Sequence, residues 1–172
     1  LDGLALRNVR AELRVDGRPR EDAFGELSFT PFGITGPVIL TLSGCAVDAL
    51  EAGHDVGLTI DLKPALDPSK LDRRLQRDLA DRADEPLRSL LRGLLPKPLV
   101  RVCLAELNMP PGRKGRAVSA HDRRRLGRWL KGVELNITGH RGFAEAIITA
   151  GGVDTREVDP VCMASCRCGG LY

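Results

Sequence analysis

The stretch Val9-Arg10-Ala11-Glu12-Leu13-Arg14-Val15-Asp16-Gly17 decides how the chain begins to fold. Its apolar residues occupy every second position, which is typical of a strand with one buried face. The Asp-Gly pair is a strong signal for a two-residue turn between antiparallel strands. The stretch therefore predicts a β-hairpin. Leu4 and Leu6 indicate an earlier strand segment, and the alternation shifts near Asn8.

Strand-like patterns recur on both sides of the middle of the chain. Apolar and polar residues alternate over residues 26–30, 56–62 and 133–137, which predicts half-buried strands. The more uniformly apolar residues 143–150 indicate a more buried strand. Strands are thus expected near both ends of the chain.

The middle of the chain has helical signals instead. Asp67 and Pro68 suit the N-cap and the first position of a helix, and leucines recur every four residues after them. Pro86 and Pro98 are expected to begin a second and a third helix. Ser119, with an aspartate three residues later, is expected to cap a fourth.

The order of strands, helices and strands predicts an α+β fold. Neither set of strands is large enough alone, so the two sets are expected to pair. We predict an antiparallel β-barrel-like domain that is discontinuous, formed by residues 1–62 and 132–172. A helical subdomain of about four helices, residues 63–131, is inserted between them.

Charge is unevenly distributed along the chain. Residues 63–131 contain 18 Lys and Arg against 8 Asp and Glu, a net charge of +10, whereas the remainder has a net charge of −7. One interpretation is a module that binds nucleic acid or another anion through the basic helices, including Arg123-Arg124-Arg125, Arg128 and Lys131. The other is a solvated helical face, which we favour because no aromatic residues are interspersed for base stacking. Nucleic acid is therefore not expected as a partner.

The five cysteines do not predict a disulfide framework or a metal site. Their number is odd and no secretory signal precedes them, which indicates a reducing, cytoplasmic location. Cys162, Cys166 and Cys168 cluster, but their spacing differs from that of common zinc sites. We expect no metal. No apolar run is long enough to span a membrane, so no membrane partner is expected.

The chain begins at Leu1 without an initiator methionine and ends on an apolar pair, which suggests a fragment of a longer protein. Dinucleotide-binding, phosphate-loop and hydrolase motifs are absent, and no catalytic residue is assigned. Two glycine-rich segments lie beside predicted strands, at residues 25–37 and 149–154. Pro37 is expected to begin a short helix running through Leu42, whose first amides would suit an anion.

These two segments resemble motifs of a known family. Residues 25–37, GELSFTPFGITGP, are similar to a GELLFTHFGLSGP signature. Residues 147–160 are similar to VTAGGV…EVDP, and residues 163–172 to the MES…GLY stretch that follows it. The chain resembles the bacterial aminoacetone-oxidase-like FAD-dependent oxidoreductases, also described as putative NAD(FAD)-utilising dehydrogenases.

The resemblance implies a function for the chain as a fragment. It would be the insert of a flavin-dependent oxidoreductase that covers FAD and shapes the cavity for a small-molecule substrate, without being active alone. Its partner would be a Rossmann-type FAD domain of the same polypeptide, and FAD would not be retained by the fragment. The residues expected to face the flavin are Thr30, Phe32, Gly33, Gly36, Thr149, Gly151 and Gly152.

The sequence departs from the family pattern at Pro31, where members usually have histidine, so a proton-transfer role at that position is not carried over. The three clustered cysteines also replace other residue types. Besides the flavoenzyme fragment, two alternatives stay open: the anion-binding module, and a structural domain whose helices dock a partner.

Overall fold

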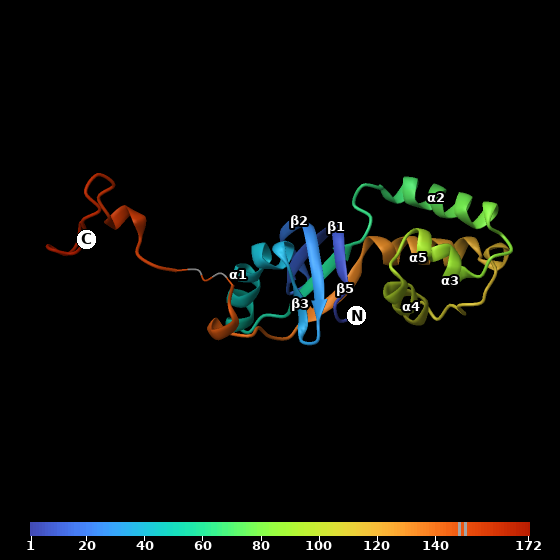
Figure 1. The fold of residues 1–172 in the computed structure, drawn as a ribbon, viewed down its shortest axis with the longest axis horizontal. Coiled ribbons are helices and arrows are strands. Elements are labelled where there is room, and N and C mark those ends of the chain that lie inside the picture. The colour runs from blue at the N-terminus through green and yellow to red at the C-terminus, as the bar shows by residue number, and fades with distance from the viewer. Residues whose placement is uncertain (148, 150) are drawn as a thin grey trace. The chain divides into compact units, whose positions relative to one another are not determined.

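The strand predicted from the opening pattern, β1 (Ala5–Val15), lies at the centre of an antiparallel sheet (Figure 1). The structure is a computed structural model that describes residues 1–147, 149 and 151–172. Within these residues the sheet has five strands in the order β3-β2-β1-β4-β5. The other strands are β2 (Arg18–Thr30), β3 (Gly33–Thr35), β4 (Val56–Asp61) and β5 (Val133–Ile137). The predicted α+β class with an antiparallel sheet is confirmed.

The register of β1 and β2 follows the sequence pattern. Val15 pairs with Arg18 across the predicted turn, where Asp16 and Gly17 both have positive φ, 49° and 73°. Two positive φ values in a two-residue turn match the right-handed twist of the strands that it joins. The pairing shifts between Leu6 and Val9, and Asn8 adopts φ 57° there. The shift of pattern predicted near Asn8 is therefore an irregularity within one strand.

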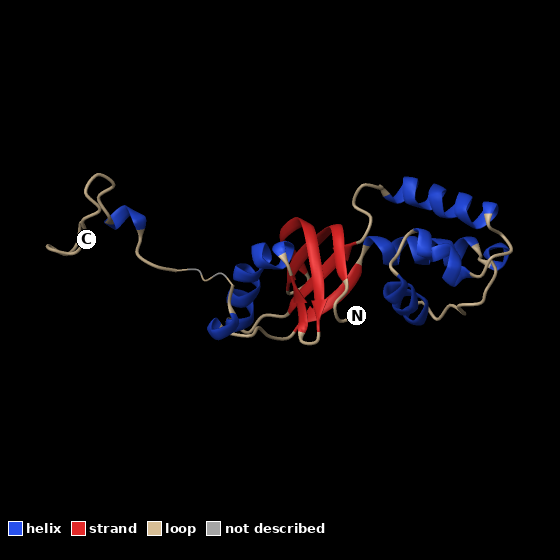
Figure 2. Ribbon diagram, viewed as in Figure 1, coloured by secondary structure: helices blue, strands red, loops and turns tan. Residues whose placement is uncertain are grey.

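Helix α1 (Pro37–Glu51) packs on one face of the curled sheet (Figure 2). It buries Val38, Leu42 and Ala46, which are spaced four residues apart along one stripe. The helix begins at Pro37 as predicted but does not stop at Leu42. It continues to Glu51 because the apolar residues that contact the sheet continue at helical spacing.

Four α-helices lie between β4 and β5, as predicted. They are α2 (Pro68–Asp81), α3 (Leu87–Leu90), α4 (Lys97–Glu106) and α5 (Ala120–Lys131), with short 3₁₀ turns at Leu91–Gly93 and Gly115–Ala117. The predicted caps are confirmed. The Asp67 carboxylate accepts a hydrogen bond from the Lys70 amide at 2.8 Å, and the Ser119 hydroxyl accepts one from the Asp122 amide at 3.1 Å.

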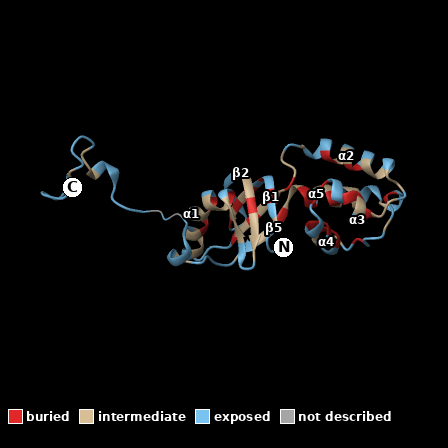
Figure 3. Cartoon of the chain, in the orientation of Figure 1, coloured by how far each residue is buried: buried red, intermediate tan, exposed pale blue. Residues whose placement is uncertain are grey.

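Buried residues occur on all the α-helices of this section (Figure 3), and most of them are leucines. Leu71 and Leu75 of α2 and Leu126 and Leu130 of α5 are all at most 3% exposed. Trp129 is largely buried as well, and its indole N–H donates to the Glu106 carboxylate at 2.6 Å. The buried side chains therefore pack α5 between α2 and the end of α4.

The helical section joins the sheet at two neighbouring strands. The Leu62 amide, just after β4, donates to the Leu130 carbonyl at 2.9 Å, close to the start of β5. The Lys131 ammonium pairs with Asp61 and donates to the carbonyls of Lys63 and Leu66. Whether residues 63–131 fold as a separate subdomain stays a prediction.

A second compact unit comprises His140–Tyr172, whereas Leu1–Gly139 form the first. The strand predicted over residues 143–150 is wrong for its described part. Phe143–Glu145 form a 3₁₀ turn and Phe143 is 82% exposed, while Ile148 and Ala150 lie outside the described residues. None of the described residues of this unit is buried, so no neighbouring strand or core selects the extended form here.

The cap of α5 makes stability dependent on pH. The Ser119 hydroxyl, and then Arg113 and Arg125, hold the pKa of Asp122 below its ordinary value. A carboxyl whose pKa is lower in the folded than in the unfolded state stabilises the fold above its unfolded pKa, about 3.9. This contribution is lost as the pH falls through the folded-state pKa.

We therefore expect Asp122→Asn to lower the urea midpoint of unfolding at pH 7. The midpoint of this variant should also fall less than that of the unchanged protein as the pH is lowered. The measurement is urea unfolding followed by circular dichroism at several pH values. Asp81→Asn is the matched control, because this exposed carboxylate has no ion-pair partner among the described residues. An unchanged acid transition in Asp122→Asn would contradict the assignment.

Candidate functional site

Three of the seven residues predicted to face a cofactor lie in the hairpin of β2 and β3, and a fourth, Gly36, directly follows it. Ser28 pairs with Thr35, Phe29 with Ile34 and Thr30 with Gly33, leaving two residues for the turn. The Thr30 hydroxyl donates to the Gly33 carbonyl and accepts from the Phe32 amide, each at 3.3 Å. Thr30 therefore stabilises the turn, and Phe32 at its tip is 74% exposed.

The two glycines of this hairpin have different roles. Gly36 has φ 108°, and a Cβ there would lie 3.0 Å from the Glu26 carbonyl oxygen. Gly33 has φ 151°, but a Cβ there would meet no atom within 4 Å. Gly36 is thus required by the close approach of two backbone segments. At Gly33 the space beside the Cα is open, and its role toward a ligand stays a prediction.

The N-terminus of α1 directly follows Gly36. Pro37 occupies the first turn, no side chain in the described residues caps the helix, and the first turn has no acidic residue. Amides at a helix N-terminus carry a partial positive charge. The start of α1 therefore presents backbone amides with no side-chain cap from the described residues and no acidic residue in its first turn.

Thr149, Gly151 and Gly152 lie in the second unit, and all three are exposed. Gly151 and Gly152 have φ 118° and 123°, and a Cβ at either would meet no atom within 4 Å. Their neighbours Ile148 and Ala150 lie outside the described residues. A shared site for these three residues and the hairpin stays a prediction.

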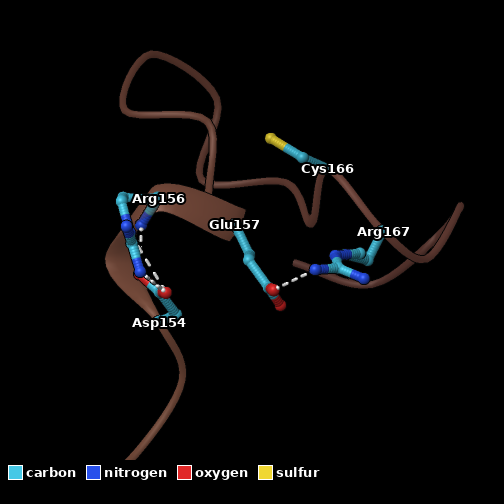
Figure 4. Close-up of a pocket in the computed structure, with 5 residues that line it drawn as sticks. All are labelled: Asp154, Arg156, Glu157, Cys166 and Arg167. Atoms are coloured by element: carbon cyan, nitrogen blue, oxygen red, sulfur yellow. Dashed lines mark hydrogen bonds and ion pairs between the residues drawn. The ribbon is translucent and has the colours of Figure 1, made fainter.

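A shallow hollow in the second unit is lined by Asp154, Arg156, Glu157, Cys166 and Arg167 (Figure 4). Asp154 pairs with Arg156 at 2.7 Å, and Glu157 pairs with Arg167 at 2.7 Å. The hydrogen bonds from Arg156 hold the pKa of Asp154 below its ordinary value. Each charge in the hollow has a partner, and none of the predicted site residues lines it.

The cysteines form no metal centre in the part of the chain that the structure describes. Cys162, Cys166 and Cys168 are exposed free thiols, and no group of three potential metal ligands is found among these residues. Cys103 is buried, and burial together with nearby Glu106 raises the pKa of its thiol to about 12. Cys103 is therefore a packing residue whose thiol is unreactive.

The basic residues singled out from the sequence separate into two groups. Arg123 pairs with Asp72 of α2, Arg125 donates to the Leu107 carbonyl, and Lys131 pairs with Asp61. These three join elements of the fold. Arg124 and Arg128 are exposed and have no ion-pair partner in the described residues. Arg124 and Arg128 lie four residues apart on one face of α5. This spacing is the sequence feature that separates them from the three paired basic residues.

Residues 1–148 match the family described as the HI0933-like protein barrel and H2TH domain. The chain belongs to this family of flavoproteins. The description names a barrel and a helical part, which agrees with the curled sheet and the helices between β4 and β5. The predicted resemblance to a flavoprotein family is confirmed, whereas the aminoacetone-oxidase subfamily stays a prediction.

Two curated relatives are similar over nearly the same part of the chain. The 3-dehydro-bile acid delta(4,6)-reductase of Clostridium scindens is 26% identical over 148 residues, covering 86% of this chain and 36% of the relative. The ribosomal RNA dihydrouridine synthase of Escherichia coli is 30% identical over 146 residues, covering 85% and 34%. The chain therefore spans about a third of the length of these relatives.

Proposed function

We propose that this chain is the part of an FAD-dependent oxidoreductase that covers the flavin and shapes the substrate cavity, and that it is not catalytic alone. The observation that carries the proposal is the β2–β3 hairpin, whose turn exposes Phe32 beside Gly33 and whose last strand leads directly into the uncapped start of α1. Membership of a flavoprotein family supports it.

The residues of the hairpin and of the start of α1 would each have a different role in holding FAD. Phe32 would supply an apolar surface and Gly33 a backbone that a flat ring can approach closely. The first amides of α1 would favour a polar or negatively charged edge of the ring. Thr30 and Gly36 would keep the turn and the helix start in place. FAD itself would supply the electron transfer, and the protein its position and electrostatic surroundings.

Thr149, Gly151 and Gly152 would face the same flavin from the second unit. Positive φ and open space at both glycines support a close approach there. The second unit also exposes large apolar side chains, namely Phe143, Ile147, Val153, Val161, Met163, Leu171 and Tyr172. An exposed apolar set in a unit without a core is expected to pack against another domain.

That other domain would be a Rossmann-type FAD domain of the same polypeptide, in a bacterial and cytoplasmic protein. The short share of each relative that this chain covers supports a longer parent. None of the helices in the described residues is both long and apolar enough to cross a membrane.

The substrate class is a separate part of the proposal. The names of the two relatives point to different classes, a bile acid derivative for one and ribosomal RNA for the other. We favour a small-molecule substrate for the cavity that faces the flavin, because the turn of the hairpin presents one aromatic side chain, that of Phe32, and backbone groups.

We expect the full-length parent to be yellow and the 172-residue chain to be colourless. In the parent, Phe32→Ala is expected to weaken FAD binding about tenfold, because covering a phenyl group contributes roughly 1.5 kcal/mol. FAD binding is measured by flavin fluorescence during titration of the apoprotein.

Phe24→Ala is the matched control, because Phe24 is also exposed on β2, at 61%, but lies away from the hairpin tip. Equal effects of the two substitutions would reject a flavin contact at Phe32. Stoichiometric flavin in the isolated chain would reject the proposed dependence on a second domain.

A further inference from the structure

The second unit, His140–Tyr172, contains three of the five cysteines of the chain. They are Cys162, Cys166 and Cys168, and all three are exposed free thiols. A cysteine often acts as a small apolar packing residue, but none of the described residues of this unit is buried. Packing therefore does not explain the cluster, whereas solvent access makes thiol chemistry available to it.

Hydrogen bonds hold the backbone around Arg167 in a curled conformation. The Ser165 hydroxyl accepts hydrogen bonds from the amides of Arg167 and Cys168, at 3.1 Å and 3.0 Å. The Cys166 amide donates to the Glu157 carbonyl at 2.8 Å. The backbones of both cysteines are therefore held in place, while their thiols are exposed to solvent.

The spacing of Cys166 and Cys168 suits a bond between their sulfur atoms. A disulfide needs Cα atoms about 4.4–6.8 Å apart. In a fully extended chain, Cα atoms two residues apart are separated by about 6.8 Å, because a strand rises about 3.4 Å per residue. The curl held by the Ser165 hydroxyl brings these two Cα atoms below that upper limit. A bridge between the two cysteines therefore needs no rearrangement of the rest of the unit.

Cys162 lies in a different loop, formed by residues 159–164. Its amide donates to the Asp159 carboxylate at 3.3 Å, within that loop. The antiparallel pairing of Val158 with Ser165 closes the loop and separates it from the other two cysteines. Cys162 is thus an exposed thiol of the same unit that does not share their backbone geometry, which makes it the matched control.

The hollow of the second unit gives a small molecule access to one of the two thiols. Cys166 lines this hollow, whose volume is about 360 Å³ (Figure 4). Small-molecule sites typically have volumes of about 300–1,000 Å³. A disulfide of low molecular weight, such as oxidised glutathione, can therefore reach the Cys166 sulfur.

We propose that Cys166 and Cys168 form a redox-active dithiol that is oxidised by low-molecular-weight disulfides such as oxidised glutathione. The thiolate of one cysteine attacks a sulfur of the small disulfide, which forms a mixed disulfide and releases one small thiol. The second cysteine then attacks the protein sulfur of the mixed disulfide, which forms the bridge and releases the second small thiol. The two protons and two electrons lost by the protein dithiol end on the two released thiols.

The bridge is expected to be reversible. It spans one intervening residue, Arg167, and so short a connection strains the bond. Strained or exposed disulfides are the ones that are readily reduced. A reversible bridge agrees with the reducing location expected from the sequence, which a permanent disulfide would not. The dithiol is also separate from the proposed flavin site, because neither cysteine is among the residues predicted to face a cofactor.

The test is reaction of the reduced 172-residue chain with oxidised glutathione, followed by alkylation of the remaining thiols in denaturant and peptide mass spectrometry. We expect alkylation to be lost at both Cys166 and Cys168, with no glutathione attached to either. Trypsin cleaves after Arg167, so a bridge keeps the peptides on its two sides joined. Excess reduced glutathione should open the bridge and restore alkylation at both positions.

Cys166→Ser and Cys168→Ser should each prevent the bridge and leave one glutathione on the remaining cysteine, because the second thiol is missing. Cys162→Ser should form the bridge as the unchanged chain does. Circular dichroism checks that all three variants fold. The proposal fails if both thiols stay alkylated, if glutathione remains attached to them in the unchanged chain, if Cys162→Ser prevents the bridge, or if the bridge joins two chains. A bridge that reduced glutathione does not open would be a permanent disulfide and would also overturn the proposal.

Discussion

Replacing Gly36 with alanine is expected to destabilise the chain by about 3 kcal/mol, which would be among the largest effects of a single added methyl group. The residue has φ 108°, and a Cβ would lie 3.0 Å from the Glu26 carbonyl oxygen and 3.4 Å from the Leu27 Cα. Both neighbours are backbone atoms of β2, so neither can move without disturbing the sheet. Urea unfolding followed by circular dichroism measures the loss.

Gly33→Ala provides the matched comparison. Its φ of 151° is also unfavourable for alanine, but its Cβ would enter open space. We therefore expect a loss of about 1 kcal/mol, from backbone strain alone. Equal losses for the two substitutions would show that close packing at Gly36 is not the cause. In the full-length parent, Gly33→Ala should nevertheless affect FAD binding, if the flavin approaches this backbone.

Leu126→Ala is expected to cost about 3–4 kcal/mol, because it leaves a cavity at a fully buried position. Leu126 is 0% exposed and lies on the face of α5 that packs in the helical core. The free energy of unfolding again measures the effect. Leu107→Ala, at a half-buried position after α4, is the control and should cost clearly less.

Leu126→Ala also tests the prediction that residues 63–131 form a subdomain of their own. If residues 63–131 form a subdomain, Leu126→Ala should increase amide hydrogen exchange in α2 and α5 while β1 and β2 keep their protection. A uniform increase through the sheet would mean that Leu1–Gly139 unfold as one cooperative unit.

Elements that depend on local interactions could be predicted from the sequence. The hairpin at Asp16-Gly17, the caps at Asp67 and Ser119 and the start of α1 at Pro37 each depend on a few adjacent residues. Turn conformation and helix capping involve only a few neighbouring residues. The local sequence pattern is therefore sufficient to predict these elements. The candidate flavin site in residues 25–37 rests on the family resemblance and stays a prediction.

The length of α1 and the secondary structure of the described part of residues 143–150 could not be predicted from local interactions. Apolar residues run through both segments, and their periodicity alone does not say what they pack against. The sheet supplies a surface for α1 as far as Glu51. Among the described residues of His140–Tyr172 none is buried, and the expected strand is absent from the described part of residues 143–150.

The sequence by itself therefore determined the hairpin at Asp16-Gly17, the helix starts and the charge of the helical section, because these follow from neighbouring residues and composition. Only the tertiary structure decided that β5 pairs with β4, that Gly36 and not Gly33 is closely packed, and that Arg123 is paired with Asp72 while Arg124 is exposed. The physical reason is that each of these depends on atoms distant in sequence. A contact with Asp72, 51 residues away from Arg123, exists only once α2 and α5 have packed.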